Sequence, residues 1–147
     1  MVIVTVSARG ERDGCLVGFS TQCSIDPLRF LVCLSTNNRT TELAGFADSL
    51  VVHMLHDHAN DRALARRFGE ETGHDVDKLE GCDWEIGPDD APVLSQCDWF
   101  WGRIAERITL GDHVGFVLDV AEGNAPRTRE PYLDFVAVRH LDAGNPP

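Results

Sequence analysis

The 147-residue sequence lacks an apolar run long enough to cross a bilayer. Its first residues, MVIVTVSARG, also lack the basic segment that precedes the apolar part of a secretory signal. Basic residues are few: 13 lysines and arginines stand against 24 aspartates and glutamates, which gives a formal net charge of −11. Because an acidic surface repels phosphate backbones and anionic lipids, we expect a cytoplasmic protein without a nucleic-acid or membrane partner.

The five cysteines lack any Cys-x-x-Cys spacing, and their number is odd. Disulfide frameworks and structural zinc sites use paired cysteines at short, regular spacings. We therefore interpret all five as reduced thiols that act as small buried hydrophobic residues: Cys15, Cys23, Cys33, Cys82 and Cys97.

Internal repeats, low-complexity segments and linkers are also missing, so we expect a single domain over residues 1–147 with an irregular tail at 139–147. Residue alternation and β-branched content predict the strands, and apolar periodicity with capping residues predicts the helices. The expected strands cover 2–8, 14–19, 29–35, 49–55, 83–86, 97–109, 113–123 and 131–138, and the expected helices cover 37–49 and 59–73. Short connections favour a mainly β, largely antiparallel barrel, closed or partly closed, with two or three short helices.

Some details of these elements are also predicted. The apolar run at 29–35 is typical of a strand that is buried on both faces. Asn37 or Asn38 is expected to cap the first helix, and Asn60 or Asp61 the second, because short polar side chains accept hydrogen bonds from free amides.

The segment HMLHDH at 53–58 combines three histidines and an aspartate, residue types that bind zinc or iron. If the segment ends a strand, His53 and His56 lie on opposite faces, and His58 lies beyond the strand. Three ligands cannot converge on one ion from these positions without a sharp bulge. We therefore favour one strand histidine and two turn histidines, and expect no metal.

Three other segments have candidate binding chemistry. GCLVGFSTQCSIDP at 14–27 places a glycine inside a strand, which fits either a ligand ring lying against the strand or a β-bulge with a turn. LSTNNRTT at 34–41 gathers amides, hydroxyls and Arg39 at a helix start, which fits either a bound phosphate or ordinary capping. GDH at 111–113 begins a strand with His113, which either contacts a ligand or has a structural role.

In this order, the segments resemble the flavin reductase-like family, whose members are split β-barrels that bind FMN. The matching motifs are GCLVGFSTQ, the Ser24-x-x-Pro27 turn, LSTNNRT, LARRFGEETG and GDH, over about residues 2–121. The resemblance implies a split β-barrel that forms a homodimer with flavin near the interface. It also implies FMN as cofactor, with FAD or a deazaflavin as alternatives, and NAD(P)H as hydride donor.

The resemblance further implies individual residue roles. His113 would be the catalytic residue near flavin and nicotinamide, and Phe68 would belong to the helix that covers the flavin. The residues along the isoalloxazine ring and ribityl chain would be Gly18, Phe19, Ser20, Cys23 and Ser24. The residues of the phosphate corner would be Ser35, Asn37, Asn38, Arg39 and Thr40.

These roles imply an oxidoreductase: an NAD(P)H-dependent FMN reductase, with an oxygenase as a candidate partner that receives the reduced flavin. Two alternatives stay open. One is a non-catalytic FMN- or deazaflavin-binding module or electron carrier, and the other is an interaction domain that has the barrel but binds nothing. In a dimer, the tryptophans would lie in the interface or the core: Trp84, Trp99 and Trp101.

Overall fold

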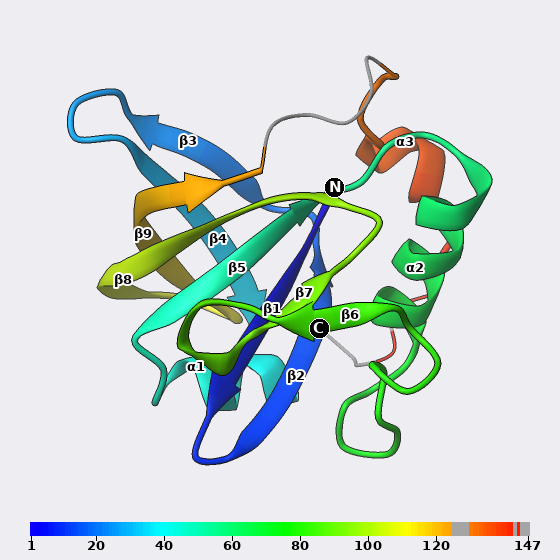
Figure 1. The fold of residues 1–147 in the computed structure, drawn as a ribbon, viewed down its shortest axis with the longest axis horizontal. Helices are drawn as coiled ribbons and strands as arrows, with labels where there is room; N and C mark the ends of the chain where they lie inside the picture. Colours follow the sequence, from blue (N-terminus) through cyan, green and yellow to red (C-terminus); the bar gives the residue numbers. More distant parts are fainter. Residues whose placement is uncertain (125–129, 143, 145–147) are drawn as a thin grey trace.

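The computed structural model describes residues 1–124, 130–142 and 144, and its main feature is a seven-stranded antiparallel sheet (Figure 1). The strand order is β2-β1-β5-β8-β9-β4-β3. These strands are β1 (Val2–Ala8), β2 (Glu11–Val17), β3 (Ser20–Ser24), β4 (Arg29–Ser35), β5 (Ser49–Met54), β8 (Asp98–Leu110) and β9 (His113–Gly123). The remaining elements are β6 (Trp84–Ile86), β7 (Pro92–Leu94), the 3-10 turn Pro88–Asp90, α1 (Arg39–Ala44), α2 (Ala59–Glu70) and α3 (Phe135–Val138). The prediction of a mainly β, antiparallel fold with short helices is confirmed.

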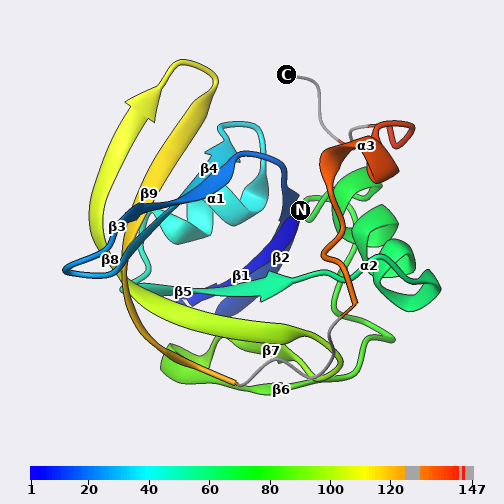
Figure 2. The ribbon, with the colours of Figure 1, turned by 90° about the horizontal axis from the view of Figure 1, so that it is seen from above.

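The sheet curls into a split barrel, and its two edge strands, β2 and β3, are consecutive in the chain (Figure 2). Only Gly18 and Phe19 separate them, and the amide of Cys33 on β4 donates to the Phe19 carbonyl at 2.9 Å. Helix α1 lies inside the curl and buries Leu43 and Ala44 there. Aliphatic side chains and one phenylalanine dominate this barrel core: Val4, Val6, Val32, Leu34, Leu50, Val52, Phe116 and Leu118.

A second core forms outside the barrel, where α2, the segment after it and α3 pack against β1, β2 and the residue after β5. Its buried members come from distant segments: Ile3, Leu55, Ala65, Phe68, Leu79, Leu94, Cys97, Leu133 and Val138. Strand β1 therefore contributes to both cores, since Val2, Val4 and Val6 face the barrel while Ile3 faces α2.

Three details of the sequence prediction are wrong. Strand β4 is not buried on both faces: of its seven residues only Val32 and Leu34 are buried, because no described element covers its outer side. The segment 131–138 is not a strand; it holds the single-turn helix α3, where the Asp134 carboxylate accepts from the Ala137 amide at 2.9 Å. The predicted strand 14–19 ends at Val17, and Ser20 starts a new strand.

The helix caps also differ from the prediction in one case. Asn38 takes the N-cap position of α1, although its side chain makes no capping hydrogen bond there. Helix α2 is capped by His58 instead of Asn60 or Asp61, because the buried Asp61 carboxylate accepts from the His56 amide at 2.7 Å and belongs to the first turn. Within the described ranges, no helix is both long and apolar enough to span a membrane.

Candidate functional site

Phe19 and His113 meet at the edge of the barrel where β2 passes into β3 and β9 begins. Their ring centroids lie 5.2 Å apart with the planes tilted by 60°. Ser35, at the end of β4, is the register partner of His113. The Phe19 ring is 64% exposed, which is unusual for a large aromatic side chain outside an interaction site. We call this region the mouth and define it by Gly18, Phe19, Ser35 and His113.

The His113 ring is held by its neighbour. Its Nδ1 lies 2.8 Å from the Asp112 carboxylate, and because a carboxylate accepts, this contact places the proton on Nδ1. The hydrogen bond from His113 in turn lowers the pKa of the Asp112 carboxyl. Thr36 fixes the turn, since its amide and hydroxyl both donate to the Asp112 carbonyl, at 2.9 and 3.1 Å. The Nε2 atom is thus left as the ring atom that can contact a ligand.

Among the described residues, no contact requires a glycine at position 18. Its φ is not positive, and a Cβ built there would come no closer than 3.8 Å to any other residue, the Met1 side chain. A glycine at an open position between two strands leaves the backbone accessible to a ligand. The open backbone at Gly18 beside the exposed Phe19 ring therefore fits a flat ring such as that of a flavin.

Strand β3 continues from the mouth as an exposed edge. Ser20 and Ser24 are partly exposed, so their hydroxyls can reach a ligand. Cys23 is exposed as well, which corrects the expectation that every cysteine is buried. Cys15 and Cys97 are buried, and Cys33 and Cys82 are partly buried. None of these five cysteines, all of which lie within the described residues, forms a disulfide.

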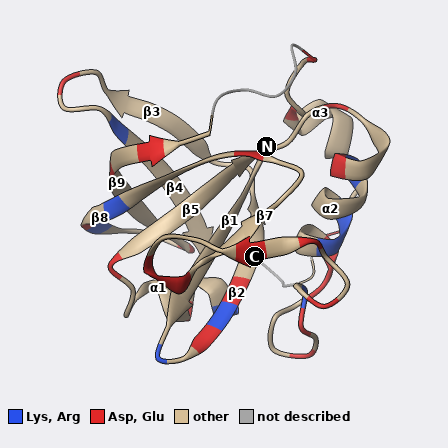
Figure 3. Ribbon diagram, in the orientation of Figure 1, with Lys and Arg blue, Asp and Glu red and all other residues tan. Residues whose placement is uncertain are grey.

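In the structure, the residues of the predicted phosphate corner lie in two separate places. Ser35 and Asn37 lie near the mouth, where the Asn37 amide is 3.4 Å from the Ser35 hydroxyl. Arg39 instead forms an ion pair with Glu11 and donates from Nη1 to the Gly73 carbonyl at 3.1 Å. Glu11 lies at the far end of β2 from Gly18, seven residues or about 23 Å along the strand. Basic and acidic residues adjoin at that end of β2 (Figure 3).

Thr40 belongs to the protein interior. It is fully buried and donates from its hydroxyl to the Asp13 carboxylate at 2.8 Å. The same carboxylate lies 3.6 Å from the ammonium of Lys78, which is the only lysine of the chain and is only 3% exposed. Burial raises the pKa of the neighbouring Cys15 thiol to about 11. This buried cluster was missed by the sequence prediction, although a single lysine in an acidic chain was a usable signal.

Gly73 closes the loop over this cluster. A Cβ at position 73 would lie 2.5 Å from Asp13 Oδ2 and 2.7 Å from Oδ1, so the backbone passes directly over the carboxylate. Together with the Arg39 bond to its carbonyl, this contact fixes the loop after α2 onto the start of β2. In this structure the predicted corner residues Arg39 and Thr40 thus bind the start of β2 and the loop after α2.

Phe68 is only 2% exposed and lies in the second core, beneath β2. A Cβ at Gly14 would come within 2.9 Å of its ring, so the ring packs against the strand on the side away from the barrel. A side chain buried in this way has no surface left for a flavin. The structure thus shows a packing role for Phe68, and the covering of the flavin by its helix stays a prediction.

Comparison with known proteins decides the family. The flavin reductase like domain matches residues 1–140 of the chain. This chain belongs to that family.

Curated relatives agree with this assignment. The chain is 29% identical over 116 residues to a probable flavin reductase of Rhizobium meliloti (strain 1021), covering 76% of this chain and 36% of that protein. It is 28% identical over 119 residues to the stachydrine N-demethylase reductase subunit Stc3 of the same organism, covering 78% of this chain and 50% of that one. The chain thus spans half or less of the length of these two relatives.

Solved structures have the same fold. A flavin reductase domain protein from Arthrobacter sp. FB24 superposes with a TM-score of 0.77 at 26% identity, covering 86% of this chain and 77% of that one. The NADH:FAD oxidoreductase SgcE6 of Streptomyces globisporus C-1027 also superposes with a TM-score of 0.77, at 24% identity, over 88% of this chain and 76% of its own.

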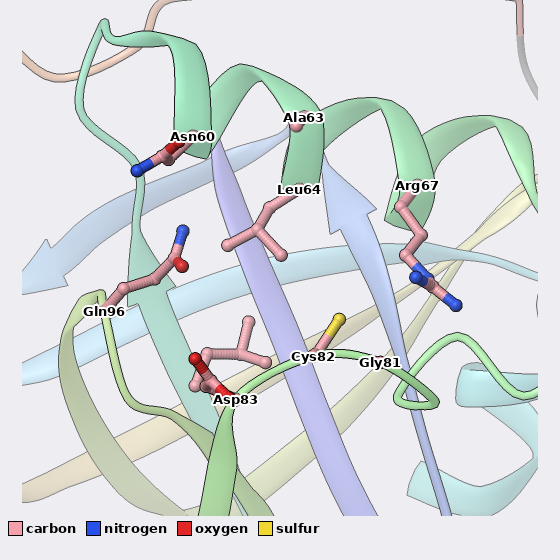
Figure 4. Close-up of a pocket in the computed structure, with 9 residues that line it drawn as sticks. Asn60, Ala63, Leu64, Arg67, Gly81, Cys82, Asp83 and Gln96 are labelled. Carbon is pink, nitrogen blue, oxygen red and sulfur yellow. The ribbon is translucent and has the colours of Figure 1, made fainter.

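The flavin reductase-like chain also has a cavity of about 280 Å³ outside the barrel, between α2 and the segments at 81–83 and 94–96 (Figure 4). Leu64 and Leu94 form its apolar wall, and Arg67 lies at one end. The Glu71 carboxylate lies 3.7 Å from the Nε atom of that arginine, and Asp83 lines the same cavity. No residue predicted for the flavin site lines this cavity, so it is separate from the mouth.

Proposed function

We propose that this protein is an NAD(P)H-dependent flavin reductase that takes FMN as its flavin. The observation that carries the proposal is the mouth itself: an exposed Phe19 ring packed on His113, beside Gly18, which no contact within the described part of the chain requires to be a glycine. This arrangement occurs in a chain of the flavin reductase-like family.

The residues of the mouth have separable tasks in this proposal. Gly18 and the backbone of Ser20 would hold the flat ring, with Phe19 limiting the access of water to one side. The Nε2 atom of His113 would hydrogen-bond the nicotinamide substrate, since Nδ1 is engaged by Asp112. When bound, the flavin supplies the hydride-accepting chemistry, so the protein needs to orient the reactants more than to move protons.

The flavin phosphate would be held by Ser35 and Asn37, which lie beside the mouth. Arg39 would join them only if it exchanges Glu11 for the phosphate. If Arg39 makes this exchange, Arg39→Ala should weaken FMN binding by about 1.5–3 kcal/mol, the range for a hydrogen bond to a charged group. Riboflavin, which has no phosphate, is the matched ligand: equal losses for FMN and riboflavin would show that Arg39 does not contact the phosphate. Glu11→Gln is the matched variant and should not weaken FMN binding.

We also propose that two copies of the chain form a homodimer that completes the mouth. On the outer face of the sheet, Leu31, Ile108 and Leu110 gather over Gly115, whose Cβ would lie 2.9 Å from Leu110 and 3.3 Å from Leu31. Ile108 and Leu110 are exposed, at 39% and 45%. An apolar sheet face beside an open ligand edge favours a second protein surface there. Light scattering on the purified protein tests this, and a monomer at micromolar concentration would contradict it.

Delivery of reduced flavin to an oxygenase partner is proposed from two similar proteins. Stc3 is named as the reductase subunit of a demethylase. The structure of nitrilotriacetate monooxygenase component B from Mycobacterium thermoresistibile has the same fold, with a TM-score of 0.76 at 21% identity.

Two measurements test the catalytic proposal. Titration of the protein with FMN, FAD and riboflavin, followed by fluorescence quenching, measures whether and which flavin binds. Anaerobic mixing of the flavin-loaded protein with NADH and then NADPH should bleach the flavin absorption. Binding without bleaching by either nucleotide would leave a flavin-binding module or electron carrier, and the absence of any binding would contradict the flavin site.

A further inference from the structure

Both ring nitrogens of His56 face acceptors. Nε2 lies 2.9 Å from the Asp98 carboxylate, and Nδ1 lies 3.0 Å from the Glu130 backbone carbonyl. A carbonyl oxygen only accepts, so Nδ1 must bear a proton, and an ionised carboxylate requires a proton on Nε2 as well. The geometry therefore matches a doubly protonated imidazolium, buried at 3% exposure.

His53, three residues earlier, has the opposite arrangement. Its Nδ1 lies 3.1 Å from the Ile3 carbonyl, while its Nε2 accepts from the Leu94 amide at 3.1 Å. One acceptor and one donor fit a neutral ring. Burial lowers the pKa of His53 to about 4, so this ring stays neutral near physiological pH. His53 is therefore an internal control for the protonation of the His56 ring.

His56 joins the last part of the chain to the sheet. We call residues 130–138 the C-terminal strap. The Asp57 amide donates to the Pro131 carbonyl at 2.9 Å, and the Leu133 amide donates to the Leu55 carbonyl at 2.6 Å. The Tyr132 ring stacks on the His56 ring with centroids 4.6 Å apart. Leu133 and Val138 then bury their side chains in the second core.

We propose that His56 is a pH-sensitive clasp: as an imidazolium between the Asp98 carboxylate and the Glu130 carbonyl, it fastens the C-terminal strap to the end of β5. Loss of one ring proton removes the positive charge opposite Asp98 and, with it, the hydrogen bond either to the Glu130 carbonyl or to the Asp98 carboxylate. The strap then keeps its backbone hydrogen bonds to Leu55 and Asp57 and the bond from the Met1 ammonium to the Leu133 carbonyl, but its hydrogen bond from the charged His56 ring is weakened or lost. This inference does not depend on the proposed flavin chemistry.

The groups around the ring favour its charged form. Asp98 from β8 contacts it directly, and Asp61 from α2 accepts from the His56 amide. His58, before α2, stacks at 6.3 Å and lies 3.7 Å from Asp61. From the strap, Tyr132 offers its ring face and Glu130 its carbonyl. Asp57 is already paired with the Arg62 guanidinium at 2.5 Å, which leaves the local balance negative.

The direction of the pH effect follows from these contacts. Burial opposes the charged ring, but the hydrogen bonds to Asp98 and Glu130 outweigh it and raise the pKa of His56 above its ordinary value of 6.5. A raised pKa in the folded state means that the clasp contributes its full stabilisation below pH 6.5. That contribution is lost as the pH rises through the higher folded-state pKa.

Nitrogen NMR of the histidine rings and amide hydrogen exchange test the clasp in the intact chain. Below pH 6.5, both His56 nitrogens should have protonated shifts, whereas His53 should have one of each kind. As the pH rises, protection of the Leu133 amide, corrected for intrinsic exchange, should fall relative to amides of the β1–β5 ladder. The fall should be about tenfold for each pKa unit between the fastened and released ring.

Two variants distinguish the loss of the His56 clasp from a general destabilisation of the fold. Asp98→Asn should remove the pH-dependent part of Leu133 protection, while Asp112→Asn, which removes the carboxylate from the exposed His113 contact, should retain it. If Asp98→Asn does not fold, the wild-type spectra alone decide the question. A His56 ring with one unprotonated nitrogen below pH 6.5 would overturn the proposal. So would Leu133 protection that follows the β1–β5 ladder throughout the titration.

Discussion

Removing the charge of Asp13 or of Lys78 alone is expected to destabilise the protein more than removing both. The pair is deeply buried, with side chains 6% and 3% exposed and a nitrogen–oxygen distance of 3.6 Å. Thr40 adds a hydrogen bond to the same carboxylate at 2.8 Å. Breaking a buried pair by removing one partner leaves an unpaired charge and costs about 3–5 kcal/mol, whereas replacing both partners by neutral groups of similar size is often near neutral.

Urea unfolding of a double-mutant cycle measures this difference. Lys78→Met and Asp13→Asn should each lower the free energy of unfolding by about 3 kcal/mol or more, and the double variant by clearly less than the sum. Asp75→Asn is the control, because it removes an exposed carboxylate from the same loop and should change stability by less than about 0.5 kcal/mol. Additive effects of the two single substitutions would refute the reasoning, since they would mean that the charges do not interact.

A chemical assay reports the same cluster independently. Because Lys78 is the only lysine, reaction of its side chain with an amine reagent is visible as the mass change of one internal peptide. Burial should make this reaction slow in the wild-type protein and faster in Asp13→Asn. Fast labelling of the wild-type side chain would mean that the loop opens readily, and the stability argument would then fail.

Two further substitutions separate the mouth from the core. Gly18→Ala should leave the free energy of unfolding within about 1 kcal/mol of wild type, because a Cβ there makes only an ordinary contact with the Met1 side chain, yet it should weaken flavin binding measured by fluorescence titration. Unchanged flavin affinity would remove Gly18 from the site. Phe68→Ala should do the reverse and cost about 3–5 kcal/mol in urea unfolding, with flavin affinity of the folded protein retained. A selective loss of flavin affinity would restore the covering role that its burial argues against.

The strands were predictable because period-two alternation and short connections leave few arrangements other than an antiparallel sheet. The sequence was a weaker guide to which faces of those strands are covered by other elements. The apolar run at 29–35 suggested burial on both sides, but that property belongs to β1, which contributes to both cores. A run of apolar residues indicates a strand; whether another layer covers its second face depends on where α2 and the C-terminal strap pack.

The candidate site was likewise predictable from the sequence only in part. Gly18, Phe19 and His113 come together as the resemblance implied, because register between β4 and β9 and the short passage from β2 to β3 fix them. The directions in which the Arg39 and Thr40 side chains point were not predictable from their positions in the motif. Each side chain follows a partner from elsewhere in the chain: Glu11 and Gly73 for Arg39, and Asp13 for Thr40.

The two buried histidines show that hydrogen-bond partners from distant parts of the chain, and not residue type alone, determine which protonation state a ring is matched to. His53 and His56 lie three residues apart on one strand end, yet one is matched to a neutral ring and the other to a charged ring. The difference comes from an amide at Leu94 in the first case and from a carboxylate at Asp98 and a carbonyl at Glu130 in the second. These partners are separated from the histidines by 41, 42 and 74 residues, so no local motif encodes them. A cluster such as HMLHDH therefore acquires its chemistry only when the fold determines which of its nitrogens meet donors and which meet acceptors.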